Sequence, residues 1–230
     1  MRQARLSLLK LMLLLLSLMA STGANAGLFG FGGDSWKEEV MLHDGQRIVV
    51  KRSQTYGGRH EIGQGGAISG QELSFSLPSS NKSITFKDEY SVDIGGRNFL
   101  LLALHVLNGT PYVVVQTVGC FADNKWGRPS PPYLFFKYDG KAWQRISVAE
   151  FPIEFTTINL LVHTKETNIT VQPIITPDIL KKMNGNYKTI NRNAVRYEGP
   201  GACGEMIYDG KGGWHGTGLF GKTHEACLQI

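Results

Sequence analysis

The sequence lacks the short motifs that indicate common enzymatic activities. It contains no phosphate-loop sequence, no His-Glu-x-x-His zinc motif and no Gly-x-Ser-x-Gly nucleophile motif. Residues 199–204 match the glycine spacing of a dinucleotide-binding loop, but no helical pattern follows them, so we reject that interpretation. We therefore expect no cofactor. The sequence leaves open whether the protein is an enzyme, but the missing motifs favour a protein without catalytic activity.

A strong charge of either sign is also missing. The 230 residues carry a net charge of +5 at pH 7, yet residues 1–26 hold three basic residues and no acidic one. Without that segment the net charge is +2 over 204 residues. Proteins that bind nucleic acid usually present a clustered basic face, so we expect no nucleic-acid partner. With 42% hydrophobic residues, the chain can bury the core of a single domain.

No apolar run approaches the roughly 20 residues needed to span a bilayer. The N-terminus instead has the parts of a secretory signal: basic residues, an apolar stretch over 11–20, and the small-x-small sequence Ala24-Asn25-Ala26. We expect cleavage near Ala26, which makes residues 1–26 a signal peptide. The mature chain is then periplasmic or secreted and has no transmembrane segment. An uncleaved membrane anchor is the alternative.

Cysteine is scarce, and the count is odd: Cys120, Cys203 and Cys227. Disulfides persist in exported proteins, and three cysteines allow one bridge in three pairings. We expect Cys203–Cys227, because this bridge would close a tail loop of about 25 residues and stabilise it by roughly 3 kcal/mol. Cys120 would then be a small buried apolar residue. Together with His215 and His224 these cysteines do not have zinc-ligand spacing, so we expect no metal site.

Turn signals dominate the rest of the chain and predict a mainly β fold. Asp44-Gly45, Asn108-Gly109 and Asp139-Gly140 each separate two β-like runs, which predicts three hairpins. Further strands are expected over residues 72–77, 83–87, 155–163 and 169–175. We expect an antiparallel sandwich-like domain with one short helix. A propeller-like or barrel-like antiparallel arrangement is the alternative.

Local patterns refine this prediction. Residues 99–106 are almost continuously apolar, which indicates a central strand buried on both faces. Thr176 as N-cap, Pro177 at the first helical position and a stop at Asn184-Gly185 predict the helix. Residues 27–35 would be a flexible glycine-rich tether and 36–230 the single domain. Its C-terminal segment has nine glycines among residues 199–221, where we expect loops and short strands.

One candidate binding surface lies in residues 124–133. Its prolines favour a stiff extended path that could present Trp126, Arg128 and Tyr133. An indole face can stack on a ligand, and a guanidinium can bind a carboxylate or phosphate. The alternative, which we favour, is that Trp126 packs over one end of a sheet.

A second candidate is the polar loop that contains Arg59, His60 and Glu61. Neighbouring residues of an extended chain point to opposite faces, so this loop alone cannot assemble a catalytic trio. Arg59 and His60 remain candidate binding residues. A solvated hairpin end is the interpretation we favour, because most loops are connectors.

Three stretches of the chain carry a family resemblance. They are Trp36-Lys37-Glu38-Glu39-Val40 with Asp44-Gly45, then residues 124–133, and then residues 135–146 continuing to 150–152. In these stretches the chain resembles a family of uncharacterised exported bacterial proteins of proteobacterial type. The resemblance implies export and a bacterial envelope setting. It assigns no reaction and no catalytic residue.

Together these observations predict a non-catalytic binding or interaction module of the cell envelope. Its partner would be an envelope protein or a glycan. The competing hypothesis is an envelope hydrolase that acts on glycan or peptide, with dispersed carboxylates or histidines brought together by the fold. A third is a structural or assembly protein, which would show a large exposed apolar patch.

Overall fold

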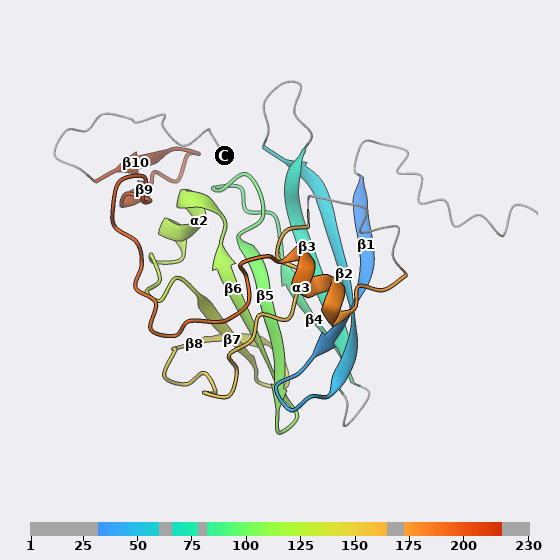
Figure 1. Ribbon diagram of the computed structural model, residues 1–230. Coiled ribbons are helices and arrows are strands. Elements are labelled where there is room, and N and C mark those ends of the chain that lie inside the picture. Colours follow the sequence, from blue (N-terminus) through green and yellow to red (C-terminus); the bar gives the residue numbers. More distant parts are fainter. Residues whose placement is uncertain (1–31, 60–65, 78–81, 165–172, 218–230) are drawn as a thin grey trace, which may run out of the picture. The chain divides into compact units, whose positions relative to one another are not determined.

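The computed structural model describes residues 32–59, 66–77, 82–164 and 173–217. The chain divides into residues 1–32 and 33–230, and all the helices and strands described belong to the second unit. The expected signal peptide with its cleavage site, His60, Cys227 and most of the strand expected over 169–175 lie outside the described residues. Figure 1 shows the arrangement of the described elements.

The first sheet is an antiparallel meander in the order β1-β2-β3-β4, formed by β1 (Gly33–Met41), β2 (Arg47–Gly58), β3 (Ala67–Ser76) and β4 (Ser83–Asp88). The expected tether is therefore too long, because residues 33–35 belong to β1. Gly33 pairs with Thr55, and a Cβ atom at Gly33 would lie 2.9 Å from the Gln54 carbonyl oxygen. Glycine thus allows the close approach at which this sheet begins.

The second sheet has the order β5-β6-β7-β8, formed by β5 (Phe99–Leu107), β6 (Thr110–Thr117), β7 (Leu134–Tyr138) and β8 (Trp143–Ile146). All three predicted hairpins are confirmed. Asn108 and Gly109 both have positive φ, 50° and 74°, as a two-residue primed turn requires. At the other two turns only the glycine has positive φ.

The two sheets face each other across one apolar core. Its buried side chains come from both sheets, and they include Val50 and Leu73 from the first sheet and Leu104 and Val113 from the second. In the described residues neither sheet closes on itself, and an isolated bridge from Glu38 to Ile175 extends the first sheet at β1. The antiparallel sandwich-like prediction is confirmed, and the described strands form neither a propeller nor a closed arrangement.

β5 is buried on both faces as predicted, but it is an edge strand of its sheet rather than a central one. Leu102 interrupts the pairing with β6, and its carbonyl accepts hydrogen bonds from Asn159 N and Leu160 N at 3.2 and 3.1 Å. The Asn159 side chain pairs with both backbone groups of Leu104, at 2.9 and 2.8 Å. The strand expected over 155–163 is therefore wrong. An asparagine amide covers the edge where a strand was expected.

The predicted short helix is confirmed as α3 (Pro177–Met183), with Thr176 as N-cap and Gly185 at φ 54° just beyond its end. The Thr176 side chain makes no capping hydrogen bond. Leu180 packs with Trp36 of β1 in a small apolar cluster. The helix thereby covers the end of the first sheet where β1 starts.

The same end of the first sheet buries an ion pair between Glu38 of β1 and Arg52 of β2, at 3.0 Å. Both side chains are at most 1% exposed. The Glu38 carboxylate also accepts hydrogen bonds from Trp36 Nε1 at 2.7 Å and from Leu161 N at 3.0 Å. Arg52 donates to the Leu161 carbonyl at 3.2 Å. Glu38 and Arg52 thus both bind the backbone of Leu161 and attach this residue to the first sheet.

We predict that Arg52→Met lowers the free energy of unfolding by about 3–5 kcal/mol, because it leaves the Glu38 carboxylate buried without its counter-charge. Urea unfolding measures this loss. The matched control is Arg47→Met, which breaks the exposed pair of Arg47 with Glu39 on the same two strands and should cost less than about 1 kcal/mol. Equal losses in the two variants would contradict a special role for the buried pair.

Candidate binding site

Trp126 follows α2 (Gly119–Lys125), a short helix that the sequence did not predict. Its half-buried ring lies 4.8 Å from the Phe99 ring, measured between centroids. Its Nε1 donates a hydrogen bond to Asn98 Oδ1 at 3.0 Å. The interpretation that Trp126 packs over one end of a sheet agrees with these contacts.

The predicted surface of Trp126, Arg128 and Tyr133 is not assembled as one patch. Tyr133 packs against a separate apolar cluster that includes Phe135 and Phe151, while Trp126 packs against the core between the two sheets. Arg128 has a positive φ of 51° and pairs with Glu198 at 3.1 Å. The three side chains therefore have separate contacts. Of the three, only Trp126 lines the groove described below.

In the second candidate loop the structure describes Arg59 but not His60. The Arg59 backbone N donates to the Gly95 carbonyl at 2.7 Å, and a Cβ atom at Gly95 would lie 2.9 Å from the Arg59 Cβ. Arg59 thus contacts the loop between β4 and β5. A binding role for Arg59 and His60 stays a prediction.

The disulfide joins Cys120 to Cys203, with an S–S distance of 2.07 Å, so the expected Cys203–Cys227 pairing is wrong. α2 brings Cys120 beside the glycine-rich tail, a contact between residues 83 positions apart that spacing could not reveal. Asn124 of the same helix supports it. Its side chain donates to the Gly204 carbonyl at 2.9 Å and accepts from Met206 N at 2.7 Å.

The tail forms the predicted short strands, β9 (Met206–Tyr208) and β10 (Trp214–Gly216), which pair as a small hairpin. Trp214 stacks on Phe121 of α2, with centroids 5.5 Å apart and planes 8° from parallel. Its Nε1 donates to the Asp93 carbonyl at 2.8 Å. The tail is thereby attached both to α2 and to the β4–β5 loop.

A groove of about 400 Å³ lies between the end of β4 and the second sheet, and we call it the aromatic groove. Its size falls in the roughly 300–1,000 Å³ range of small-molecule sites. Six aromatic residues contribute to its lining, which are Phe86, Tyr90, Phe99, Trp126, Phe136 and Trp143. No sequence pattern predicted it, because its walls come from both sheets and from α2.

Hydrogen bonds fix both indoles of the aromatic groove. Trp143 Nε1 donates to the Thr85 carbonyl at 2.8 Å, as Trp126 Nε1 does to Asn98. Both rings are half-buried. Among the ring pairs of the described residues, neither indole has a parallel stacking partner. The two rings are therefore held in place before any ligand arrives.

Asp88 supports the floor of the aromatic groove. Its carboxylate accepts hydrogen bonds from Asn98 N, Asn98 Nδ2, Phe99 N and Gln71 Nε2, at 2.9 to 3.1 Å. The residue is 3% exposed. Because both carboxylate oxygens are occupied, Asp88 holds backbone and side chains in place instead of facing a ligand.

The two lysines of the rim are paired with carboxylates. Lys125 Nζ contacts Asp93 at 2.9 Å and Lys87 Nζ contacts Glu72 at 2.8 Å. Burial opposes ionisation of Asp93, but hydrogen bonds from Ser91 and Lys125 outweigh it and lower the Asp93 pKa. The hydrogen bond to Glu72 raises the Lys87 pKa, and Glu89 adds to this effect. Among the described residues, no ion pair is formed by Glu89, the other charged residue of the rim.

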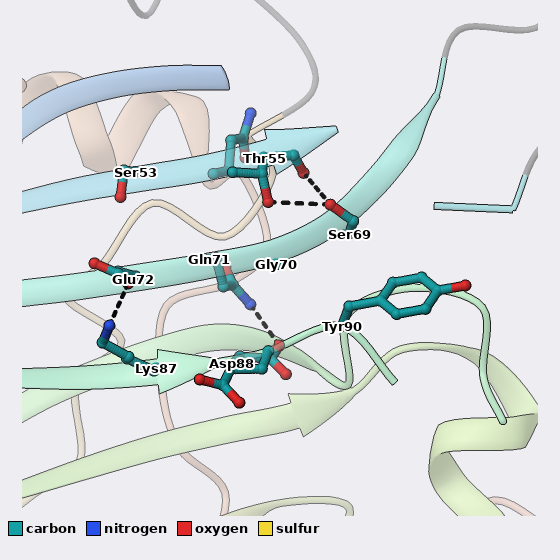
Figure 2. A pocket seen from close by; sticks show the side chains of 11 residues that line it. Ser53, Thr55, Ser69, Gly70, Gln71, Glu72, Lys87, Asp88 and Tyr90 are labelled. Carbon is teal, nitrogen blue, oxygen red and sulfur yellow. Dashed lines mark hydrogen bonds and ion pairs between the residues drawn. The ribbon is translucent and has the colours of Figure 1, made fainter. Parts of the chain in front are cut away.

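A second concavity, the outer hollow, lies on the opposite face of the first sheet and holds about 420 Å³. Figure 2 shows Thr55 hydrogen-bonded to Ser69 across two strands and Lys87 reaching Glu72. The pairing of β2 with β3 shifts register between Thr55 and Tyr56, so that Ser69 is skipped in the pairing. Gly70 has no side chain and leaves the floor of the outer hollow open. Residues 87–90 line both the outer hollow and the aromatic groove.

No protein-family model, curated protein or solved structure matches the chain. In the part of the chain that the structure describes, no helix is long and apolar enough to cross a bilayer. Among these same residues, no three His, Cys, Asp or Glu side chains gather as a metal site would require.

We predict that peptide mapping under non-reducing conditions recovers one peptide pair linked through Cys120 and Cys203. Cys120→Ser should lower the free energy of unfolding by about 4 kcal/mol, because the bridge closes a loop of more than 80 residues. Cys227→Ser serves as the control and should leave the mapped bridge in place. A recovered Cys203–Cys227 peptide pair would contradict the structure.

Proposed function

We propose that this protein is an exported, non-catalytic binding module of the cell envelope and that the aromatic groove is its binding site. The observation that carries the proposal is the pair of indoles, Trp126 and Trp143, fixed at the groove by hydrogen bonds to Asn98 and Thr85. Side chains fixed before binding lose little conformational entropy on binding, so they favour affinity.

Three features support export to the periplasm or beyond. The N-terminal sequence has the parts of a signal peptide with cleavage near Ala26, and the chain resembles exported bacterial proteins. The Cys120–Cys203 bridge adds a structural reason, since disulfides form and persist in oxidising compartments.

The charges at the aromatic groove support binding over catalysis. A glycoside hydrolase needs two carboxyl groups with different tasks, one protonated and one ionised, flanking the substrate. Asp88 is enclosed by amide donors, and the pKa of Asp93 is lowered beside Lys125. A general acid needs a raised pKa, which is the opposite of the shift at Asp93, and the Asp88 carboxylate is occupied by its four donor groups. This favours the binding module over the envelope hydrolase that we consider as the alternative.

The proposal is tested on protein purified from the envelope fraction of its own host. We expect a native mass spectrum with extra mass that disappears on denaturation, and Trp143→Leu should lose that mass. The same envelope material, incubated with the protein, should be recovered with its own mass unchanged.

Two results would contradict the proposal. Fragments released from the envelope material would identify a hydrolase. Bound mass retained in Trp143→Leu, and lost instead in a control variant outside the groove such as Tyr197→Leu, would place the binding surface elsewhere. Tyr197 is 66% exposed and does not line the groove.

A further inference from the structure

We infer that the outer face of the first sheet binds the surface of an anionic phospholipid bilayer. Four residues of β1 and β2 on this face form what we call the lysine patch: Lys37, Met41, Val49 and Lys51. None of them lines the aromatic groove. The inference therefore goes beyond the proposed function and concerns a second surface of the protein.

The alternation of the strands places the lysine patch on the side that faces away from the core. Val40 of β1 and Val50 of β2 are buried between the sheets, and neighbouring residues of a strand point to opposite faces. The four residues of the patch alternate with these valines, and all four are exposed. The patch is therefore open to a partner.

The two lysines of the patch lie directly opposite each other, because the register of β1 with β2 pairs Lys37 with Lys51. The Lys37 carbonyl accepts a hydrogen bond from Ile175 N at 2.9 Å, on the other edge of β1, so the two lysines are a non-hydrogen-bonded pair of the β1–β2 ladder. Side chains are closest at such pairs, and like charges that face each other there destabilise a sheet. An anionic partner would offset this cost.

No carboxylate of the protein neutralises these two lysines. Glu39 and Glu72 lie on the same face, but Glu39 pairs with Arg47 at 3.2 Å and Glu72 pairs with Lys87 at 2.8 Å. Among the described residues, neither lysine of the patch forms an ion pair. Two positive charges therefore remain for a partner that carries negative charge.

Two exposed apolar side chains lie beside the lysines. Val49 precedes Lys51 by two positions on the same face of β2 and is 53% exposed. Met41, which is 40% exposed, pairs with Arg47 and is thus the diagonal neighbour of Val49. Diagonal neighbours on one face are within reach of long side chains. The patch therefore combines positive charge with apolar surface.

This combination favours a bilayer over a soluble acidic glycan. A soluble polyanion would bind the ammonium groups and leave both apolar side chains in water. At a bilayer the lysines meet lipid phosphates while the apolar side chains enter the boundary between headgroups and acyl chains. Each lysine near an anionic bilayer strengthens the association roughly fivefold, so the two unpaired lysines supply a weak and reversible attachment.

Vesicle sedimentation tests the inference with protein purified from the envelope fraction of its own host. We expect binding to vesicles that mix phosphatidylglycerol with phosphatidylcholine and much weaker binding to vesicles of phosphatidylcholine alone. Added salt should weaken the binding, because it screens interactions between exposed charges. Polygalacturonate, an acidic glycan, is the comparison probe and should bind less tightly than the anionic vesicles.

The decisive variant combines Lys37→Gln with Lys51→Gln. It should bind the anionic vesicles about tenfold more weakly or worse. Its stability in urea should equal or exceed that of the wild type, because two opposed like charges are removed. The matched control combines Lys181→Gln with Lys182→Gln, which removes the same charge from exposed positions of α3 and should keep the vesicle binding. Met41→Gln should also weaken vesicle binding, because a polar amide does not enter the acyl boundary.

Three results would overturn the inference: no preference for the anionic vesicles, an equal loss of binding in the two double lysine variants, or tighter binding of polygalacturonate than of the vesicles. The last result would make the patch a glycan-binding surface. The outcomes also separate this inference from the proposed function, because Trp143 lies outside the patch and Trp143→Leu should leave vesicle binding unchanged. If Trp143→Leu keeps both the envelope ligand and the vesicle binding, the groove proposal fails and this inference stands.

Discussion

The carboxylate of Asp88 is the contact on which the candidate site depends. It lies at the end of β4 and accepts hydrogen bonds from β3, through Gln71, and from the start of β5, through Asn98 and Phe99. It therefore joins the two sheets where the aromatic groove opens. Asn98, held in this way, accepts the indole N–H of Trp126. The position of one groove wall thus follows from a buried polar contact and not from apolar packing alone.

Polar side chains replace regular strand pairing elsewhere in the fold. The segment after β8 forms no strand over residues 155–163, yet Asn159 completes the edge of β5 and Asn184 pairs with Val162 N and the Leu160 carbonyl. Glu38 and Arg52 bind the backbone of Leu161. Buried backbone groups need partners, and here amides, a carboxylate and a guanidinium supply them. The irregular segment can therefore cover both sheets.

The sequence predicted the elements whose signals are local. Three turn dipeptides predicted their hairpins, and Thr176 with Pro177 predicted α3, because turn and capping preferences act within a few residues. The cysteine pairing and the aromatic groove could not be predicted in this way. Cys120 and Cys203 are 83 positions apart in the sequence, and Trp143 is 58 positions from Thr85, whose carbonyl accepts its indole hydrogen bond. The apolar composition of β5 indicates burial on both faces and so predicts a central strand, whereas no local pattern reveals Asn159 as its edge partner.

The most direct test is Asp88→Asn, followed by urea unfolding and by the indole resonance of Trp126. The central claim predicts a loss of about 3 kcal/mol, since an amide presents a donor to groups that need acceptors. It also predicts a shifted Trp126 resonance and weaker binding of envelope material, because Asn98 loses its support. An Asp88→Asn variant with wild-type stability and an unchanged Trp126 resonance would contradict the claim that this carboxylate organises the site.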